Sequence, residues 1–131
     1  MKLIGFIKEH DKIEEAKEYK NILGHEHELN NNQVINKIIN YLDNGVYLLG
    51  WMNTIVSLDT NELIVPNCYY TDGNFVWPAY FSYYLRKYPN YKIDSDFLKH
   101  LEKNNFDFSK IKISNELKLD LEKQLPHNLK L

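Results

Sequence analysis

The sequence has very little cysteine, arginine and glycine. Its 131 residues include one cysteine, Cys68, one arginine, Arg86, and five isolated glycines. A single cysteine excludes an intramolecular disulfide and a cysteine-rich metal site. The sequence also lacks a glycine-rich phosphate loop, a G-x-S-x-G nucleophile elbow and an HExxH zinc motif. The enzyme classes that depend on these motifs are therefore not indicated.

Long hydrophobic runs are absent as well. Residues 1–11 hold a few apolar side chains before charged residues return, which is too short for a signal-peptide core or a membrane span. We expect a cytoplasmic protein that does not bind membranes. The net charge of −2 does not indicate a large nucleic-acid-binding surface. The length predicts a single globular domain over residues 1–131, with a core that needs neither disulfides nor metals.

Tyrosine is abundant, and seven of the ten tyrosines lie between Cys68 and Tyr91. Within this stretch Asp72-Gly73 separates two β-favouring runs, which predicts a hairpin because glycine accepts the positive φ of a tight turn. Pro78 is predicted to stop the second strand because it lacks an N–H group, and its fixed φ suits the first turn of a helix. Aromatic residues then recur at helical spacing up to Pro89. The stretch predicts a strand, a turn, a strand and an aromatic-faced helix.

Hydrophobic spacing predicts the remaining elements. Residues 3–8 form either a short strand or an apolar plug. Asp11 and Glu14 have the spacing of a capping box at the start of a helix. The other predicted helices span 11–23 and 33–43, begin at Asp94 or Ser95, and begin at Ser114 and end at Pro126. The predicted strands span 46–58 (with a bulge near Gly50 or Asn53), 62–71 and 74–77. The predicted fold class is α+β, an antiparallel meander of three or four strands with about five helices packed on it.

Titratable residues show no catalytic pattern. Zinc usually needs three or four ligands, so we interpret His25-Glu26-His27 as part of a solvated loop. Two carboxylate pairs fit structural roles, Asp59 with Glu62 in a turn and Asp94 with Asp96 at a helix N-terminus, where the helix dipole favours negative charge. Cys68 is typical of a small buried hydrophobe. We predict no catalytic residue, no cofactor and no metal.

Two groups of side chains are candidates for binding a partner. The helix after Pro78 carries more aromatic residues than one buried face can hold, so Tyr80 and Tyr83 are candidates for exposed interface residues. Core packing remains the default interpretation of this helix. The second group is acidic and is normally a solvated face, but a partner that bound it would be basic. It consists of Glu14, Glu15, Glu18, Glu26 and Glu28.

Three short motifs together resemble a known pattern. They are Tyr70-Thr71-Asp72-Gly73, Val76-Trp77-Pro78 and the paired Tyr83-Tyr84. The pattern is that of small bacterial immunity proteins, the antitoxins encoded beside polymorphic or contact-dependent growth-inhibition toxins. Tyr41-Leu42-x-x-Gly45 and Ile4-Gly5-Phe6-x-Lys8-Glu9-His10 are similar too. The resemblance covers the middle third well and the ends loosely, and its motifs are structural.

The resemblance implies a cytoplasmic protein without enzymatic activity that neutralises a cognate toxin domain by tight stoichiometric binding. It carries over no toxin-contacting residue. If the toxin is a nuclease, its substrate groove is basic, and the acidic residues would mimic phosphate. Two alternatives remain open. One is a small enzyme that uses His10 or His100 with Asp72 or Asp94 in a cleft, and the other is an interaction module that forms a homodimer through the tyrosine-rich helix.

Overall fold

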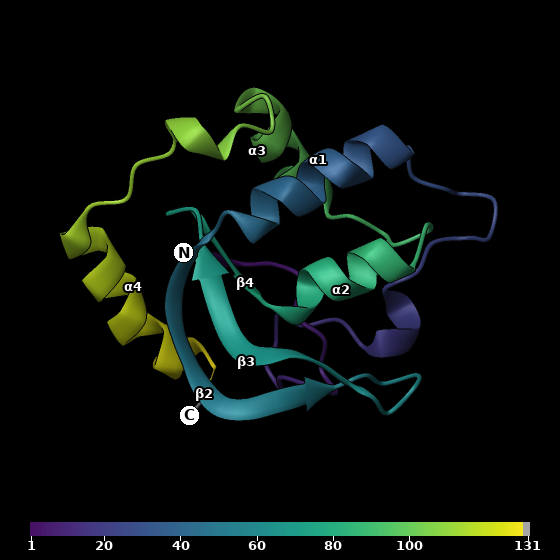
Figure 1. The fold of residues 1–131 in the computed structure, drawn as a ribbon, viewed down its shortest axis with the longest axis horizontal. Coiled ribbons are helices and arrows are strands. Elements are labelled where there is room, and N and C mark those ends of the chain that lie inside the picture. Colours follow the sequence, from purple (N-terminus) through teal and green to yellow (C-terminus); the bar gives the residue numbers. More distant parts are fainter. Residues whose placement is uncertain (130–131) are drawn as a thin grey trace.

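The computed structural model describes residues 1–129 and has an α+β fold built on a four-stranded sheet (Figure 1). The strands are β1 (Lys2–Leu3), β2 (Val46–Val56), β3 (Leu63–Thr71) and β4 (Phe75–Pro78), in the order β1-β4-β3-β2. Within the described residues the helices are α1 (Asn32–Asp43), α2 (Tyr80–Lys87), α3 (Ser95–Lys103) and α4 (Asn115–Asn128), with the 3₁₀ helices η1 (Tyr19–Asn21) and η2 (Phe108–Lys110).

The predicted α+β class is confirmed, but the sheet is mixed rather than purely antiparallel. Strands β2, β3 and β4 form the predicted antiparallel meander. Strand β1 adds to the far side of β4 in parallel, with Lys2 opposite Phe75 and Leu3 opposite Val76. The sequence did not decide between a strand and an apolar plug for residues 3–8, because a two-residue strand is too short to produce a periodic signal. The prediction of about five helices exceeds the four α-helices by one.

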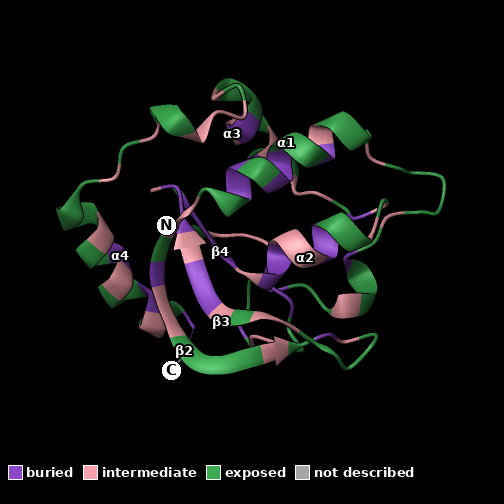
Figure 2. Cartoon of the chain, viewed as in Figure 1, coloured by how far each residue is buried: buried purple, intermediate pink, exposed green. Residues whose placement is uncertain are grey.

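The sheet is covered on both faces, and the alternation of side chains along β4 separates two cores. Phe75 and Trp77 point into the first core, which they share with α1, α2 and α3. Val76 points into the second core, between the sheet, the N-terminal segment and α4. Figure 2 shows buried residues on the inner sides of α1 and α2, which lie beside each other over the sheet.

The predicted hairpin at Asp72-Gly73 is confirmed. Gly73 has φ +98°, which residues with a Cβ rarely adopt. The Thr71 hydroxyl donates to the carbonyl oxygen of Phe75 (2.7 Å) and accepts from the N–H of Gly73 (2.9 Å). Pro78 ends β4, as predicted, but it does not open the helix, which begins at Tyr80.

Two further helices begin as predicted. Asn31 caps α1 by accepting from the N–H groups of Gln33 and Val34, and Asp94 caps α3 in the same way. The prediction that Pro126 ends the last helix is wrong, because α4 continues to Asn128. Leucines on both sides of this proline are buried in the second core, and their packing keeps the segment helical.

The helix predicted over residues 11–23 is wrong, because this segment forms turns and the short η1. Ile13 packs in the second core, whereas Ile22 packs in the first. One straight helix could not place Ile13 and Ile22 in two cores that lie on opposite faces of the sheet. The N–H of Lys17 instead donates to the carbonyl oxygen of Phe6 (3.1 Å). Long-range pairing therefore overrides local helical propensity.

The bulge predicted near Gly50 or Asn53 is confirmed. Gly50 pairs with Cys68 and Thr54 pairs with Pro66, so three residues of β2 face a single residue, Asn67, on β3. A bulge of this kind bends the strand and re-aims its side chains. Figure 1 shows the strong curvature of β2.

Gly5 provides a test of the packing. It has φ +76°, and a Cβ placed on it would lie 2.3 Å from Cγ of Phe81. We expect Gly5→Ala to lower the free energy of unfolding by roughly 3 kcal/mol, from backbone strain and overpacking together. Urea unfolding followed by circular dichroism measures this loss. Gly24→Ala is the matched control, because its new Cβ meets only the flexible carboxylate of Glu28 closely; equal losses in both variants would contradict the packing.

Candidate binding surface and buried polar clusters

The first buried polar cluster is centred on Asp72, in the turn between β3 and β4. Its Oδ1 accepts from the backbone N–H groups of Asn74 (2.9 Å) and Phe75 (2.8 Å). Its Oδ2 accepts from the Tyr41 hydroxyl (2.6 Å) and from Nε2 of His100 (2.8 Å). The Asp72 side chain is fully buried and has four hydrogen-bond donors. The cluster therefore joins the turn to α1 and to α3.

This cluster brings together one of the His/Asp pairs considered for an enzyme, His100 with Asp72. Both carboxylate oxygens are already occupied by groups of the protein, so neither is free to act on a substrate. The remaining two candidates, His10 and Asp94, have other partners. His10 Nε2 lies 2.8 Å from the Tyr84 hydroxyl, and Asp94 accepts from two N–H groups at the start of α3. The arrangement fits structural roles for these residues.

Tyr80 was predicted as an exposed binding residue, and that prediction is wrong because the side chain is 1 % exposed. Its hydroxyl donates to Oδ2 of Asp11 (2.7 Å) and accepts from the N–H of Ile7 (3.0 Å). Oδ1 of Asp11 accepts from the hydroxyl of Tyr69 (2.6 Å). Asp11 is therefore not a helix cap, and it fastens the N-terminal segment to β3 and α2. Burial raises the pKa of Tyr80 well above its usual value, which keeps the hydroxyl a donor.

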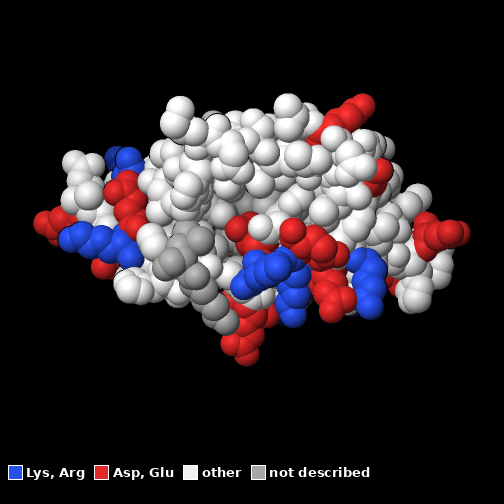
Figure 3. All heavy atoms as spheres, turned by 90° about the horizontal axis from the view of Figure 1, so that it is seen from below, with Lys and Arg blue, Asp and Glu red and all other residues white. Residues whose placement is uncertain are grey.

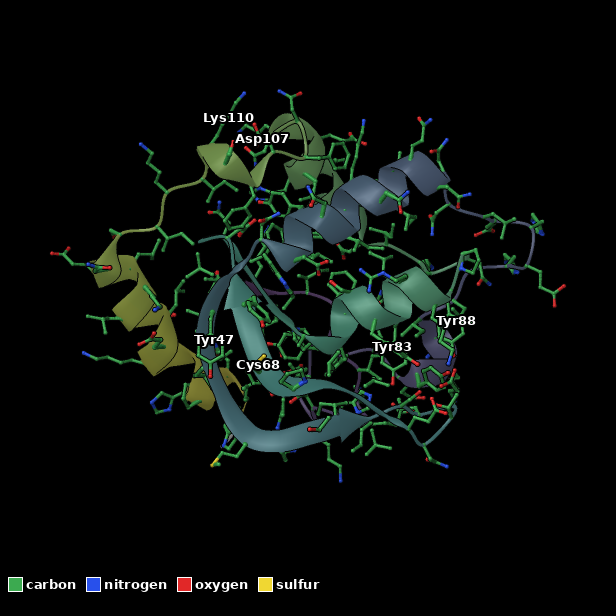
Figure 4. The ribbon with its side chains drawn as sticks, viewed as in Figure 1. Tyr47, Cys68, Tyr83, Tyr88, Asp107 and Lys110 are labelled. Carbon is green, nitrogen blue, oxygen red and sulfur yellow. The ribbon has the colours of Figure 1, made fainter. Side chains whose placement is uncertain are left out.

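A third cluster fastens the turn between β2 and β3 to the end of α2. Oδ2 of Asp59 accepts from Nζ of Lys87 (2.5 Å) and from the Tyr88 hydroxyl (2.6 Å), and Oδ1 accepts from Ser57. The Tyr88 hydroxyl also bonds to that of Tyr19. The bond from Lys87, then those from Ser57 and Tyr88, hold the pKa of Asp59 well below its usual range. Figure 4 shows Tyr88 at the end of α2, next to the segment that contains η1.

The acidic residues predicted as a binding face are exposed, but lysines are interspersed among them. Glu18 forms an ion pair with Lys20 (3.3 Å), and Glu28 lies 3.9 Å from Nε2 of His25. Figure 3 shows a band in which acidic and basic side chains alternate. The exposed acidic residues are Glu14, Glu15, Glu18, Glu26 and Glu28, and the exposed lysines among them are Lys12, Lys17 and Lys20.

Tyr83, the other predicted aromatic contact, is half-buried on α2 and lines a groove of about 350 Å³. The groove lies between α2, the end of α1 and β3, and Ile64 and Pro66 form part of its apolar wall. An ion pair between Arg86 and Asp43 (3.5 Å) stands at its rim. Figure 4 shows Tyr83 on the side of α2 that faces β3.

The outer half of the β2–β3 hairpin exposes a second group of apolar side chains. Trp51 is 42 % exposed, Leu63 is 72 % exposed and Met52 is fully exposed. We call this group, together with Val56, the hairpin surface. Figure 2 shows β2 exposed along its curve, and Figure 3, which views that side, shows a broad area without charged side chains. Exposed clusters of large apolar residues are typical of interaction sites.

The position of β2 makes this exposure unusual. It is an outer strand of the sheet, with β3 as its only partner among the described residues, and none of its eleven residues is charged. Edge strands of natural proteins normally carry charged residues that prevent unwanted pairing. The sequence identified this stretch as a strand, but sequence alone did not place it at the edge. The sequence feature that could have indicated an exposed binding strand is the run from Val46 to Val56, which contains no charged residue.

Comparison with known proteins gives no relative. No protein-family model matches the chain, and no curated protein or solved structure matches it either. The resemblance to immunity proteins therefore stays a prediction. Within residues 1–129, no group of three or more His, Cys, Asp or Glu side chains is placed to hold a metal ion. None of the helices in the described part of the chain is long and apolar enough to cross a membrane.

The surroundings of His10 predict a pH dependence of stability. Burial lowers the pKa of His10 below its usual 6.5, against the raising effects of Asp11 and Glu9. The unfolded chain therefore binds this proton first as the pH falls. The free energy of unfolding should decrease as the pH falls through the unfolded-state pKa of about 6.5 towards the folded-state pKa, and the His10 contribution should then level off.

His10→Gln should remove this part of the pH dependence while keeping a polar partner for Tyr84. The measurement is urea unfolding of both proteins between about pH 5 and about pH 8. His127→Gln, a substitution of an exposed histidine, is the control. A stability difference between wild type and His10→Gln that stays constant over this range would refute the prediction.

The Asp72 cluster gives a second prediction. Tyr41→Phe removes one donor from a buried carboxylate and should lower the free energy of unfolding by about 1.5 to 3 kcal/mol. Tyr83→Phe removes a hydroxyl that contacts only Lys87 at the surface and should cost less than about 0.5 kcal/mol. Chemical denaturation of both variants checks the difference, and similar losses would show that the Asp72 cluster is not a stabilising centre.

Proposed function

We propose that the protein is an immunity protein that neutralises a cognate bacterial toxin domain by stoichiometric binding. The single observation that carries this proposal is the hairpin surface, an exposed apolar area on an edge strand without charge. Trp and Met are among the residues enriched in protein interfaces. A solvated surface of this kind is costly unless a partner covers it.

The chemistry of the hairpin surface defines its occupant. The surface is apolar and carries no charge, so it favours an uncharged, apolar face on the toxin domain over a basic groove. Met52 projects from the bulge of β2, where it can enter a pocket on the partner, and Trp51 beside it rests edge-on against Tyr69 (5.7 Å between ring centroids). A packed Trp next to a projecting Met is suited to anchoring a partner.

The polar clusters support a binding protein over an enzyme. The His100–Asp72 pair is committed to holding the turn, α1 and α3 together. The groove beside Tyr83 is lined mainly by apolar and aromatic residues, and its other polar side chains are the Arg86–Asp43 pair and Ser82. We assign the cell's cytoplasm as the place of action, as part of the same proposal.

In the same proposal the acidic residues have a different role, which is long-range steering and not anchoring. If the toxin is a nuclease with a basic groove, Glu14, Glu15 and Glu18 would steer its approach. Their reversal to Lys should slow association and flatten its salt dependence, whereas substitutions in the hairpin surface should raise the dissociation rate. The two kinetic signatures separate steering from anchoring.

The experiment is co-expression with the cognate toxin domain, which the proposal expects to be encoded directly upstream of this chain. Wild type should protect cells, and the double variant Trp51→Glu, Met52→Glu should fail to protect because it places charge in an apolar interface. We expect binding in vitro to weaken about 100-fold or more. Leu119→Glu, at an exposed leucine on α4, is the matched control and should protect like wild type.

Circular dichroism and the urea midpoint of the double variant must match wild type. Met52→Glu alone is a second test that does not disturb the core, because the Met52 side chain is fully exposed. Full protection by the folded double variant would refute the assignment of the hairpin surface. Failure of the wild type to protect would refute the immunity function itself. A wild-type dimer in sedimentation that Met52→Glu converts to a monomer would assign the surface to a second copy of this chain instead.

A further inference from the structure

A cavity of about 560 Å³ lies at the end of the sheet where β1 and the β3–β4 turn meet α3. It is separate from the hairpin surface and from the groove beside Tyr83, and it shares no lining residue with that groove. Its polar and charged lining comes from Lys2, Asn74, Asp96, Lys99, His100 and Lys103. Cavities of this size hold small organic molecules.

Apart from His100, three of the four charged side chains in the lining are cationic. Lys2 reaches the cavity from β1, and Lys99 and Lys103 reach it from successive turns of α3. Among the described residues none of these three lysines has an ion-pair partner, whereas Lys20, Lys87 and Lys118 elsewhere do. Like charges at positions i and i+4 repel each other on a helix. An anion between them would relieve this repulsion.

Two of the lining groups are held in place before any ligand binds. Nε2 of His100 is fixed by Asp72 (2.8 Å), and its ring lies 4.9 Å from that of Phe75. Nζ of Lys2 lies over the same Phe75 ring, 5.8 Å from its centroid. Because the buried Asp72 anchors His100, this side chain needs little ordering when a ligand arrives. This part of the lining is thus preorganised at the base of a cationic cavity.

We propose that this cavity binds a small phosphorylated ligand, a phosphomonoester or a nucleotide. Lysine is a common phosphate binder that acts as a point charge, and three lysines with the Asn74 amide can surround the oxygens of one phosphate group. The single acidic side chain in the lining, Asp96, leaves the site with a net positive charge. The proposal is independent of the immunity function, because none of its residues belongs to the hairpin surface.

The test uses the full chain and three probes: inorganic phosphate, pyrophosphate and ATP. Amide resonances of Asn74, Phe75, Lys99 and His100 should shift saturably, with affinity rising from phosphate to the polyphosphates. The double variant Lys99→Gln, Lys103→Gln should bind ATP about tenfold more weakly or worse, because two cationic contacts are lost. Lys112→Gln, Lys123→Gln removes two exposed lysines elsewhere and should bind like wild type.

Three results would overturn the proposal. The first is the absence of saturable shifts at millimolar probe, with all variants folded by circular dichroism. The second is equal binding by the cavity variant and the control variant, which would mean general surface attraction. The third is tighter binding of a short single-stranded RNA that is weakened by the same Lys99 and Lys103 substitutions, which would make the cavity part of a nucleic-acid surface. None of these results depends on toxin neutralisation.

Discussion

The buried carboxylate of Asp72 is the interaction on which the rest of the structure depends. An unpaired carboxylate in the core would be strongly destabilising, so the fold must bring donors to it. Two come from the turn itself, one from Tyr41 on α1 and one from His100 on α3. These four bonds fix the positions of the β3–β4 hairpin and two helices relative to each other. The packing of Trp77 against Tyr41 and Phe97 follows from that placement.

The same chemistry recurs at the other joints of the molecule. Asp11 accepts hydrogen bonds from the hydroxyls of Tyr69 and Tyr80, and Asp59 accepts them from Tyr88 and Lys87. Tyrosine suits this role because its ring fills the core while its hydroxyl reaches a carboxylate. The abundance of tyrosine is thereby explained mainly by internal structure. Four of the large exposed apolar residues, Trp51, Met52, Val56 and Leu63, lie on the outer half of the β2–β3 hairpin, which is why that hairpin is the proposed contact with a toxin.

Local signals in the sequence predicted the α+β class, the meander, the bulge in β2 and the helix start at Asp94, since each depends on neighbouring residues. The segment 11–23 could not be predicted, because its apolar residues divide between two cores that exist only after folding. The prediction that Tyr80 is exposed failed for a related reason, because its hydrogen-bond partner Asp11 lies 69 positions away in the sequence. The hairpin surface needed the strand order, which places β2 at the edge. Residue composition alone does not reveal that order.

The central claim is that the toxin domain binds at the hairpin surface rather than at the acidic N-terminal residues. Hydrogen–deuterium exchange of the chain, free and in complex with the proposed cognate toxin domain, tests it directly. The claim predicts that complex formation slows exchange of the amides of residues 51–56 and of Leu63, at the free edge and tip of the hairpin. Protection confined to residues 14–28, with residues 51–56 exchanging as in the free protein, would contradict it.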